Sequence, residues 1–261
     1  MKKIIFTTLL LTILIGTTFY IWKDDVEPAI TYFPIDDTSS FEQASTQLSR
    51  NDMTTNPEIA WDSFSETKEP FYLRQDLSLL YKDGYFKGIL NKWKENEHTI
   101  KLHQTFSMRD DGYLQAISFH FGEIHRQDEI KSIHAMSYND LSINKPTKNK
   151  HKSQVNDSVQ KKWTSLLSYF DIDDASYHIV PLVDLHIFND RTIPSLNRDE
   201  TDKVIGQLWE GLYKNYALPI LQQKDESARH VMPLILFDKH AQHLLVLFEL
   251  QGEKIQLVQK Y

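Results

Sequence analysis

The chain has 261 residues, no cysteine and a formal net charge of −7, and 41% of its residues are hydrophobic. The lack of cysteine excludes disulfides, thiolate metal sites, cysteine nucleophiles and a lipid-bearing cysteine. The composition is ordinary for a globular protein, and the length suffices for one large domain or two modest ones.

The N-terminal segment is a long uncharged hydrophobic run. Residues 4–22 contain no charged side chain, and as a helix they would extend roughly 28 Å, close to the hydrocarbon thickness of a bilayer. Lys2 and Lys3 precede the run, which favours a cytoplasmic N-terminus and a single membrane anchor over residues 1–23. The alternative is a cleaved signal peptide, although the far end of the run lacks the small-residue cleavage pattern. Both interpretations place the bulk of the chain outside the cytoplasm.

The acidic charge of the chain is concentrated in residues 24–70. Eleven Asp and Glu residues lie there against only Arg50 and Lys68, which predicts an acidic stalk or neck between the membrane and a folded exterior. Within this stretch, cap-like residues precede hydrophobic ones at Ser40 and at Asn56-Pro57. These patterns predict two short helices.

Residues 71–144 change to an alternation of apolar and polar residues. Asp83-Gly84 and Asp111-Gly112 each lie between apolar runs, which is a strong hairpin signal. The pattern predicts an antiparallel β-meander. Its strands are expected near residues 76–82, 85–94, 99–109, 113–124 and 130–138.

A hairpin at Asp111-Gly112 would bring two histidines together. If that turn has two residues, His103 lies directly across from His120 on the polar face of the sheet. Two imidazoles at this spacing can share a divalent metal or titrate as a coupled pair. The alternative is a solvent-facing pair without a chemical role.

The C-terminal part is predicted to follow a basic linker over residues 145–156. Residues 157–261 show helical periodicity twice and two near-continuous apolar runs, so we expect two helices packed on a mainly antiparallel sheet. The whole chain is therefore placed in the α+β class. The expected helices begin near residues 157 and 199, the second ending near 217, and the expected strands are 177–188, 231–237, 243–250 and 254–260.

Asp184 and His186 form the second candidate pair, because alternate residues of a strand share a face and an aspartate can orient a histidine base. The alternative is a polar face of an edge strand. No catalytic, cofactor or metal-binding motif is found elsewhere, so no such residue set is predicted. The net acidic charge argues against a nucleic-acid partner.

The sequence therefore favours a non-enzymatic, single-pass extracytoplasmic protein that binds another envelope protein or a ligand, with residues 4–22 in the membrane. One alternative is an envelope hydrolase or metal-binding enzyme that uses His103/His120 or Asp184/His186. Another is a structural component of a membrane-associated assembly. A pocket that gathers Asp184, His186 and other titratable groups would favour the enzyme, whereas an exposed apolar surface would favour binding.

Overall fold

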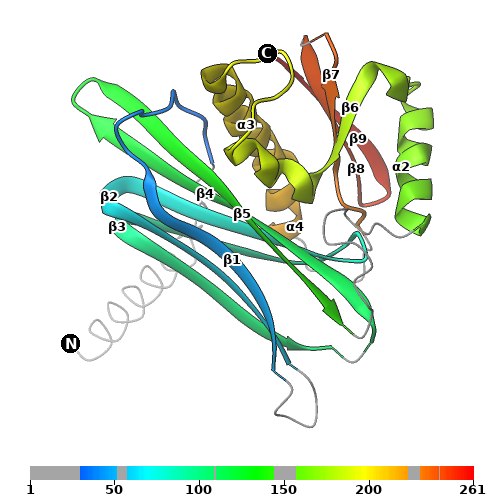
Figure 1. Cartoon of the computed structure of the whole chain (residues 1–261), viewed down its shortest axis with the longest axis horizontal. Helices are drawn as coiled ribbons and strands as arrows, with labels where there is room; N and C mark the ends of the chain where they lie inside the picture. Colours follow the sequence, from blue (N-terminus) through cyan, green and yellow to red (C-terminus); the bar gives the residue numbers. More distant parts are fainter. Residues whose placement is uncertain (1–29, 52–57, 109, 144–156, 223–229, 241) are drawn as a thin grey trace, which may run out of the picture.

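The computed structural model describes residues 30–51, 58–108, 110–143, 157–222, 230–240 and 242–261. They form an α+β fold of two antiparallel sheets with few helices, as the sequence predicted (Figure 1). The proposed anchor at residues 4–22 and the basic linker at 145–156 lie outside the described residues. Among the described residues, no helix is long and apolar enough to cross a membrane.

The first sheet contains five long strands. Strand β2 is its centre: it pairs with β3 along one edge, and along the other with β1 and then with β4, which in turn pairs with β5. The sheet is therefore not a meander, because β4 lies beside β2 rather than beside β3. The strands are β1 (Phe41–Asn51), β2 (Glu58–Lys82), β3 (Tyr85–Ser107), β4 (Gly112–Arg126) and β5 (Glu129–Ile143).

The burial of β3 and β4 explains this order. Strand β4 is buried on both faces along most of its length, so it belongs in the interior of the sheet. Strand β3 is largely exposed and carries several charged residues, which is typical of an edge strand. The predicted Asp83-Gly84 turn is present, with both residues at positive φ, whereas no β3–β4 hairpin forms at Asp111-Gly112.

Strand β2 bends between its two halves. Between the pairs Glu66↔Thr99 and Phe71↔Glu97, β2 contains three more residues than β3. Because this number is odd, the inward-facing residues change from odd numbers, such as Trp61, to even numbers, such as Ser78. The sheet thereby folds into two layers, and Trp61 donates a hydrogen bond across them to Ser78 (3.0 Å).

Most of the described residues of the predicted stalk belong to this sheet. Residues 41–51 and 58–70 form β1 and the first half of β2, and Trp61 is 1% exposed in the core between the layers. The short helix predicted after Ser40 is wrong, and so is the helix predicted after Pro57 in the part that the structure describes, from Glu58 onward. Backbone pairing with β2 and β3 outweighs the local capping signals.

The second sheet has the order β6-β7-β8-β9. Helix α2 packs on one face of it, and α3 packs on the other, between the two sheets (Figure 1). The bounds are α2 (Asp157–Tyr169), η1 (Asp174–Ser176), β6 (Tyr177–Pro181), η2 (Leu182–Asn189), α3 (Arg198–Leu212), η3 (Tyr213–Ala217), α4 (Leu218–Gln222), β7 (Leu234–Asp238), β8 (His243–Leu250) and β9 (Glu253–Lys260).

Helix α3 begins with a capping box. The Asn197 side chain accepts from the backbone N–H of Glu200 at 2.9 Å, and the Glu200 carboxylate accepts from the N–H of Asn197 at 2.9 Å. Two backbone donors at the helix start are thereby satisfied. The helix predicted over residues 199–217 is present, and it continues through the π-helical turn η3 into α4.

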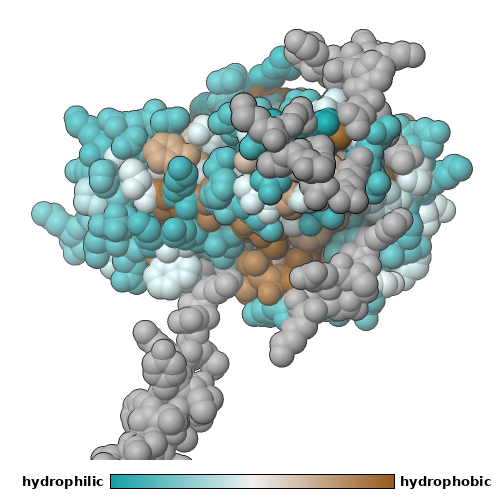
Figure 2. Space-filling model, turned by 90° about the horizontal axis from the view of Figure 1, so that it is seen from below, coloured by the Kyte–Doolittle hydropathy of each residue, from teal (hydrophilic) through white to brown (hydrophobic). Residues whose placement is uncertain are grey.

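The largest apolar core joins both sheets. It contains residues of β2, β4, α3 and β8, and the ring of Phe119 on β4 stacks on Trp209 of α3 with a centroid distance of 4.8 Å. The molecular surface seen in Figure 2 is hydrophilic over most of its area, and apolar residues gather near its middle. This is the usual distribution for a protein that buries most of its large apolar side chains.

Candidate functional site

The structure separates the two histidines that the sequence placed opposite each other. His103 of β3 lies across from Asp62 and is exposed on the outer face of the sheet. His120 of β4 lies across from Asp76 and is fully buried between the layers. The predicted His103/His120 pair is wrong because β4 pairs with β2, and each histidine instead has an aspartate of β2 as its partner.

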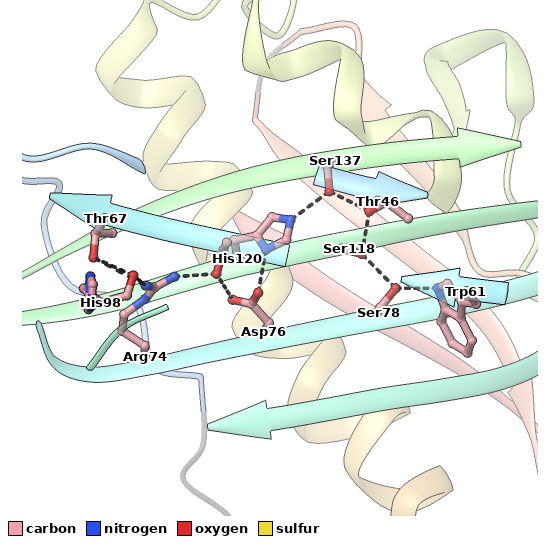
Figure 3. A network of polar contacts seen from close by, with 11 residues as sticks. Thr46, Trp61, Thr67, Arg74, Asp76, Ser78, His98, Ser118, His120 and Ser137 are labelled. Atoms are coloured by element: carbon pink, nitrogen blue, oxygen red, sulfur yellow. Dashed lines mark hydrogen bonds and ion pairs between the residues drawn. The ribbon is translucent and has the colours of Figure 1, made fainter. Parts of the chain in front are cut away.

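His120 is the centre of a buried polar network (Figure 3). Its Nδ1 lies 2.9 Å from Asp76 Oδ2, and its Nε2 lies 2.7 Å from Ser137 Oγ of β5. His120 and Asp76 have no exposed surface, whereas Ser137 is half-buried. The connectivity is that of a Ser–His–Asp triad, so the position of each proton decides whether Ser137 can act as a nucleophile.

Beyond Ser137, the network continues through hydroxyl groups from both layers. Thr46 of β1 lies 2.6 Å from Ser137 and donates to Ser118 at 2.6 Å, and Ser118 donates to Ser78 at 2.7 Å. Ser78 also accepts from Trp61. A continuous chain of hydrogen bonds therefore ties β1 and the first half of β2 to the layer of β4 and β5.

Beyond Asp76, the network ends at a buried arginine. Asp76 Oδ1 accepts from Ser65 at 2.9 Å, and Ser65 accepts from Arg74, which also donates to the backbone oxygen of His98. Burial lowers the pKa of Arg74, and the nearby carboxylates of Asp76 and Glu66 oppose this shift. Asp76 thus lies between two basic side chains.

The tautomer of His120 sets the direction of its contact with Ser137. With its proton on Nδ1, His120 donates to Asp76 and accepts from Ser137. With its proton on Nε2, His120 donates to Ser137.

A hydrolytic triad also needs a serine and a histidine that a substrate can reach. His120 and Asp76 are fully buried. The arrangement is suited to holding the two layers together through satisfied buried polar groups.

The second predicted pair lies in a short helix. Asp184 and His186 belong to η2 rather than to a strand, so the alternation that would put both on one face does not apply. His186 Nδ1 donates to the carbonyl oxygen of Val183 at 2.7 Å, and its ring stacks on Tyr138 with centroids 4.5 Å apart.

Titratable groups do gather around Tyr138. Gln115 donates to its hydroxyl at 3.2 Å, and Tyr113 donates to Asp140 nearby at 2.8 Å. Burial, reinforced by the charges of Asp140 and Asp184, raises the pKa of Tyr138 to about 12. These phenols therefore stay protonated at neutral pH and do not serve as bases.

A groove lies between α3 and β9. Its volume is about 570 Å³, and it is open to solvent. Leu208 and Gly211 of α3 form one wall, and Leu257 and Gln259 of β9 form the other. The groove thus combines apolar side chains with the edge of a sheet.

An exposed apolar side chain of β9 lies near one of α2. Among the described residues, Tyr169 (63% exposed) and Val258 (60%) are the most exposed large apolar side chains. Lys254 of β9 lies over the ring of Tyr169, 4.4 Å from its centroid, and it shares a face of the strand with Val258. Lys254, Tyr169 and Val258 therefore belong to one surface. The sequence analysis missed this surface, although the apolar residues of β9 at even and odd positions were a signal that both of its faces contact something.

Comparison with protein-family models, with curated proteins and with solved structures found no match to this chain.

Proposed function

We propose that the chain is a non-enzymatic binding module, anchored in the cell membrane by residues 4–22 and acting outside the cytoplasm on another envelope protein. The uncharged run and the lysines before it support the anchor and its orientation. The binding role rests on the folded exterior.

The observation that carries the binding role is the surface around β9. A groove of about 570 Å³ lies on one side of this strand, and the exposed Tyr169 and Val258 lie on the other. Exposed apolar side chains beside a hollow are typical of surfaces that bind another molecule. The His120 network supports the same conclusion, because the full burial of His120 and Asp76 suits stability rather than hydrolysis.

The experiment is site-directed photo-crosslinking of the full chain in its native membrane. A photoreactive amino acid at Gln207, on the groove wall, is expected to capture one reproducible protein partner. The same amino acid at Thr105, exposed on β3, serves as the matched control and should not capture it.

A groove-filling variant makes the test specific. In Gly211→Trp the added ring enters the groove, and a Cβ at this position meets no atom within 4 Å. The variant should fold and lose the crosslink from Gln207. Equal capture from Gln207 and Thr105, or unchanged capture in Gly211→Trp, would count against the proposal.

A further inference from the structure

We propose that the partner contributes an extended acidic segment, which adds to β9 as a fifth antiparallel strand of the second sheet. This inference rests on the proposed function and names the chemistry of the partner. Strand addition to a free sheet edge is a common mode of peptide recognition, in which backbone hydrogen bonds supply affinity and side-chain contacts supply specificity.

The β8–β9 turn determines which backbone groups of β9 are free. Gln251 and Gly252 have φ values of 54° and 79°, as in a two-residue type I′ turn, and Leu250 pairs with Glu253 across it. That pair exchanges both of its hydrogen bonds, so odd-numbered residues of β9 face β8. The N–H and C=O groups of even-numbered residues point to the open edge. They are those of Lys254, Gln256, Val258 and Lys260.

The two faces of the edge select different side chains of an added strand. On the α3 side, the segment would lie over the groove beside Leu257 and Gly211, which suits apolar residues of moderate size. On the other side it would lie beside Val258, whose cross-strand neighbour on β8 is Leu245. An apolar residue opposite Val258 would cover this exposed side chain.

Charge specifies the ends of the segment. Lys254 and Lys260 lie six residues apart on the same face of β9, at the two ends of the open edge. Acidic residues opposite them, also six apart, would form cross-strand ion pairs. No other charged side chain of β9 lies on this face.

The same lysines argue against a second copy of the chain. An antiparallel β9–β9 pair centred on Leu257 would place Lys254 of one copy directly opposite Lys260 of the other. Like charges directly opposite each other are destabilising, and edge lysines are a known device against self-pairing. The edge therefore favours an acidic partner over self-association.

The test uses a capped synthetic peptide, Glu-Thr-Val-Val-Thr-Val-Glu, and the full chain in detergent micelles. Antiparallel pairing places its two glutamates opposite Lys260 and Lys254, and its third residue opposite Val258. Binding is measured by fluorescence anisotropy. We expect saturable binding, and about a tenfold weaker affinity for the matched peptide with lysines in place of the glutamates.

N-methylated peptides test the backbone pairing without altering the protein. Methyl groups on the third and fifth amides remove donors that face β9 and should weaken binding at least about tenfold. Methyl groups on the fourth and sixth amides face away and should change it by less than about twofold. Equal effects of the two peptides would overturn strand addition.

Variants of β9 test the same backbone pairing by altering the protein instead of the peptide. Val258→Pro removes one outward N–H without breaking a β8–β9 hydrogen bond, and it should weaken binding at least about tenfold, whereas Val258→Thr should not. If the groove crosslink is lost in Gly211→Trp but persists in Val258→Pro, strand addition fails while the binding function stands. If the peptide binds as predicted and no membrane partner is captured, the proposed function fails instead.

Discussion

Two aspartates of β2 each contact a histidine of a neighbouring strand, at nearly equal distances. Asp62–His103 (2.8 Å) is on the outer face, with His103 54% exposed, and Asp76–His120 (2.9 Å) is fully buried. Water screens the first contact, whereas nothing but protein surrounds the second. Their contributions to stability should therefore differ greatly.

Asp76→Ala should destabilise the fold by about 3–5 kcal/mol, because it leaves Arg74 and His120 buried without their carboxylate. Asp62→Ala, the matched change at the exposed contact, should cost about 0–1 kcal/mol. Chemical denaturation of the full chain, followed by tryptophan fluorescence, measures both. Similar losses for the two variants would contradict the structural role of the network.

The sequence predicted His103 better than it predicted His120. The alternation around Ile100 and Leu102 correctly placed His103 on a polar face. His120 was assigned to the same kind of face, but both faces of β4 are covered, one by β1 and the first half of β2 and the other by α3. Which strand covers which face depends on contacts far apart in the sequence, and local alternation carries no information about them.

At the scale of elements, α3 contains two glycines in different surroundings. A Cβ at Gly206 would lie 2.5 Å from Cδ2 of Tyr32, whereas a Cβ at Gly211 would meet no atom within 4 Å. Gly206 thus allows the segment at Tyr32 to pack closely on the helix. Gly211 leaves the wall of the groove open.

Gly206→Ala should destabilise the fold by about 1–3 kcal/mol, because the methyl group must displace the ring of Tyr32. Gly211→Ala should stabilise it by about 0.5–1 kcal/mol, since alanine is the better helix former. Thermal unfolding of both variants tests the pair. Stabilisation by Gly206→Ala would show that Tyr32 does not pack on α3 as described.

Elements with strong local signals were predicted well. The helix expected from residue 199, the turn at Asp83-Gly84 and the apolar runs of β7 and β8 each correspond to an observed element. The predictions failed for β1 and the first half of β2. There the sequence carries helix-cap residues, and the strand conformation is fixed by pairing with distant residues of β3.

For the molecule as a whole, His134 lies where the first sheet meets α3. Its ring stacks on Phe119, with centroids 5.5 Å apart, close to Gly206 of α3. Burial, assisted by the charge of Arg198, lowers the pKa of His134 from its ordinary value of 6.5 to about 4. The junction between the two sheets therefore contains a histidine that resists protonation.

This histidine should make the fold sensitive to acid. In the unfolded chain His134 is protonated below pH 6.5, whereas in the folded chain it is protonated only below about pH 4. The free energy of unfolding therefore falls as the pH falls from 6.5 to about 4. His134→Gln removes this contribution and should flatten the dependence. The midpoint of urea denaturation at pH 7.5 and pH 5 measures it, and identical pH dependences in both proteins would refute the prediction.

The bend in β2 constrains how this fold can change in length during evolution. The three extra residues between Glu66 and Phe71 move the inward side from odd to even positions, so Trp61 and Ser65 meet Asp76 and Ser78 across the layers. Loss or gain of one residue there would turn the second half over, bringing Leu77 and Leu79 into the polar interior and sending Asp76 toward α3. Insertions and deletions at this point are compatible with the fold only in pairs, even though the segment has the exposed, charged character of a permissive loop.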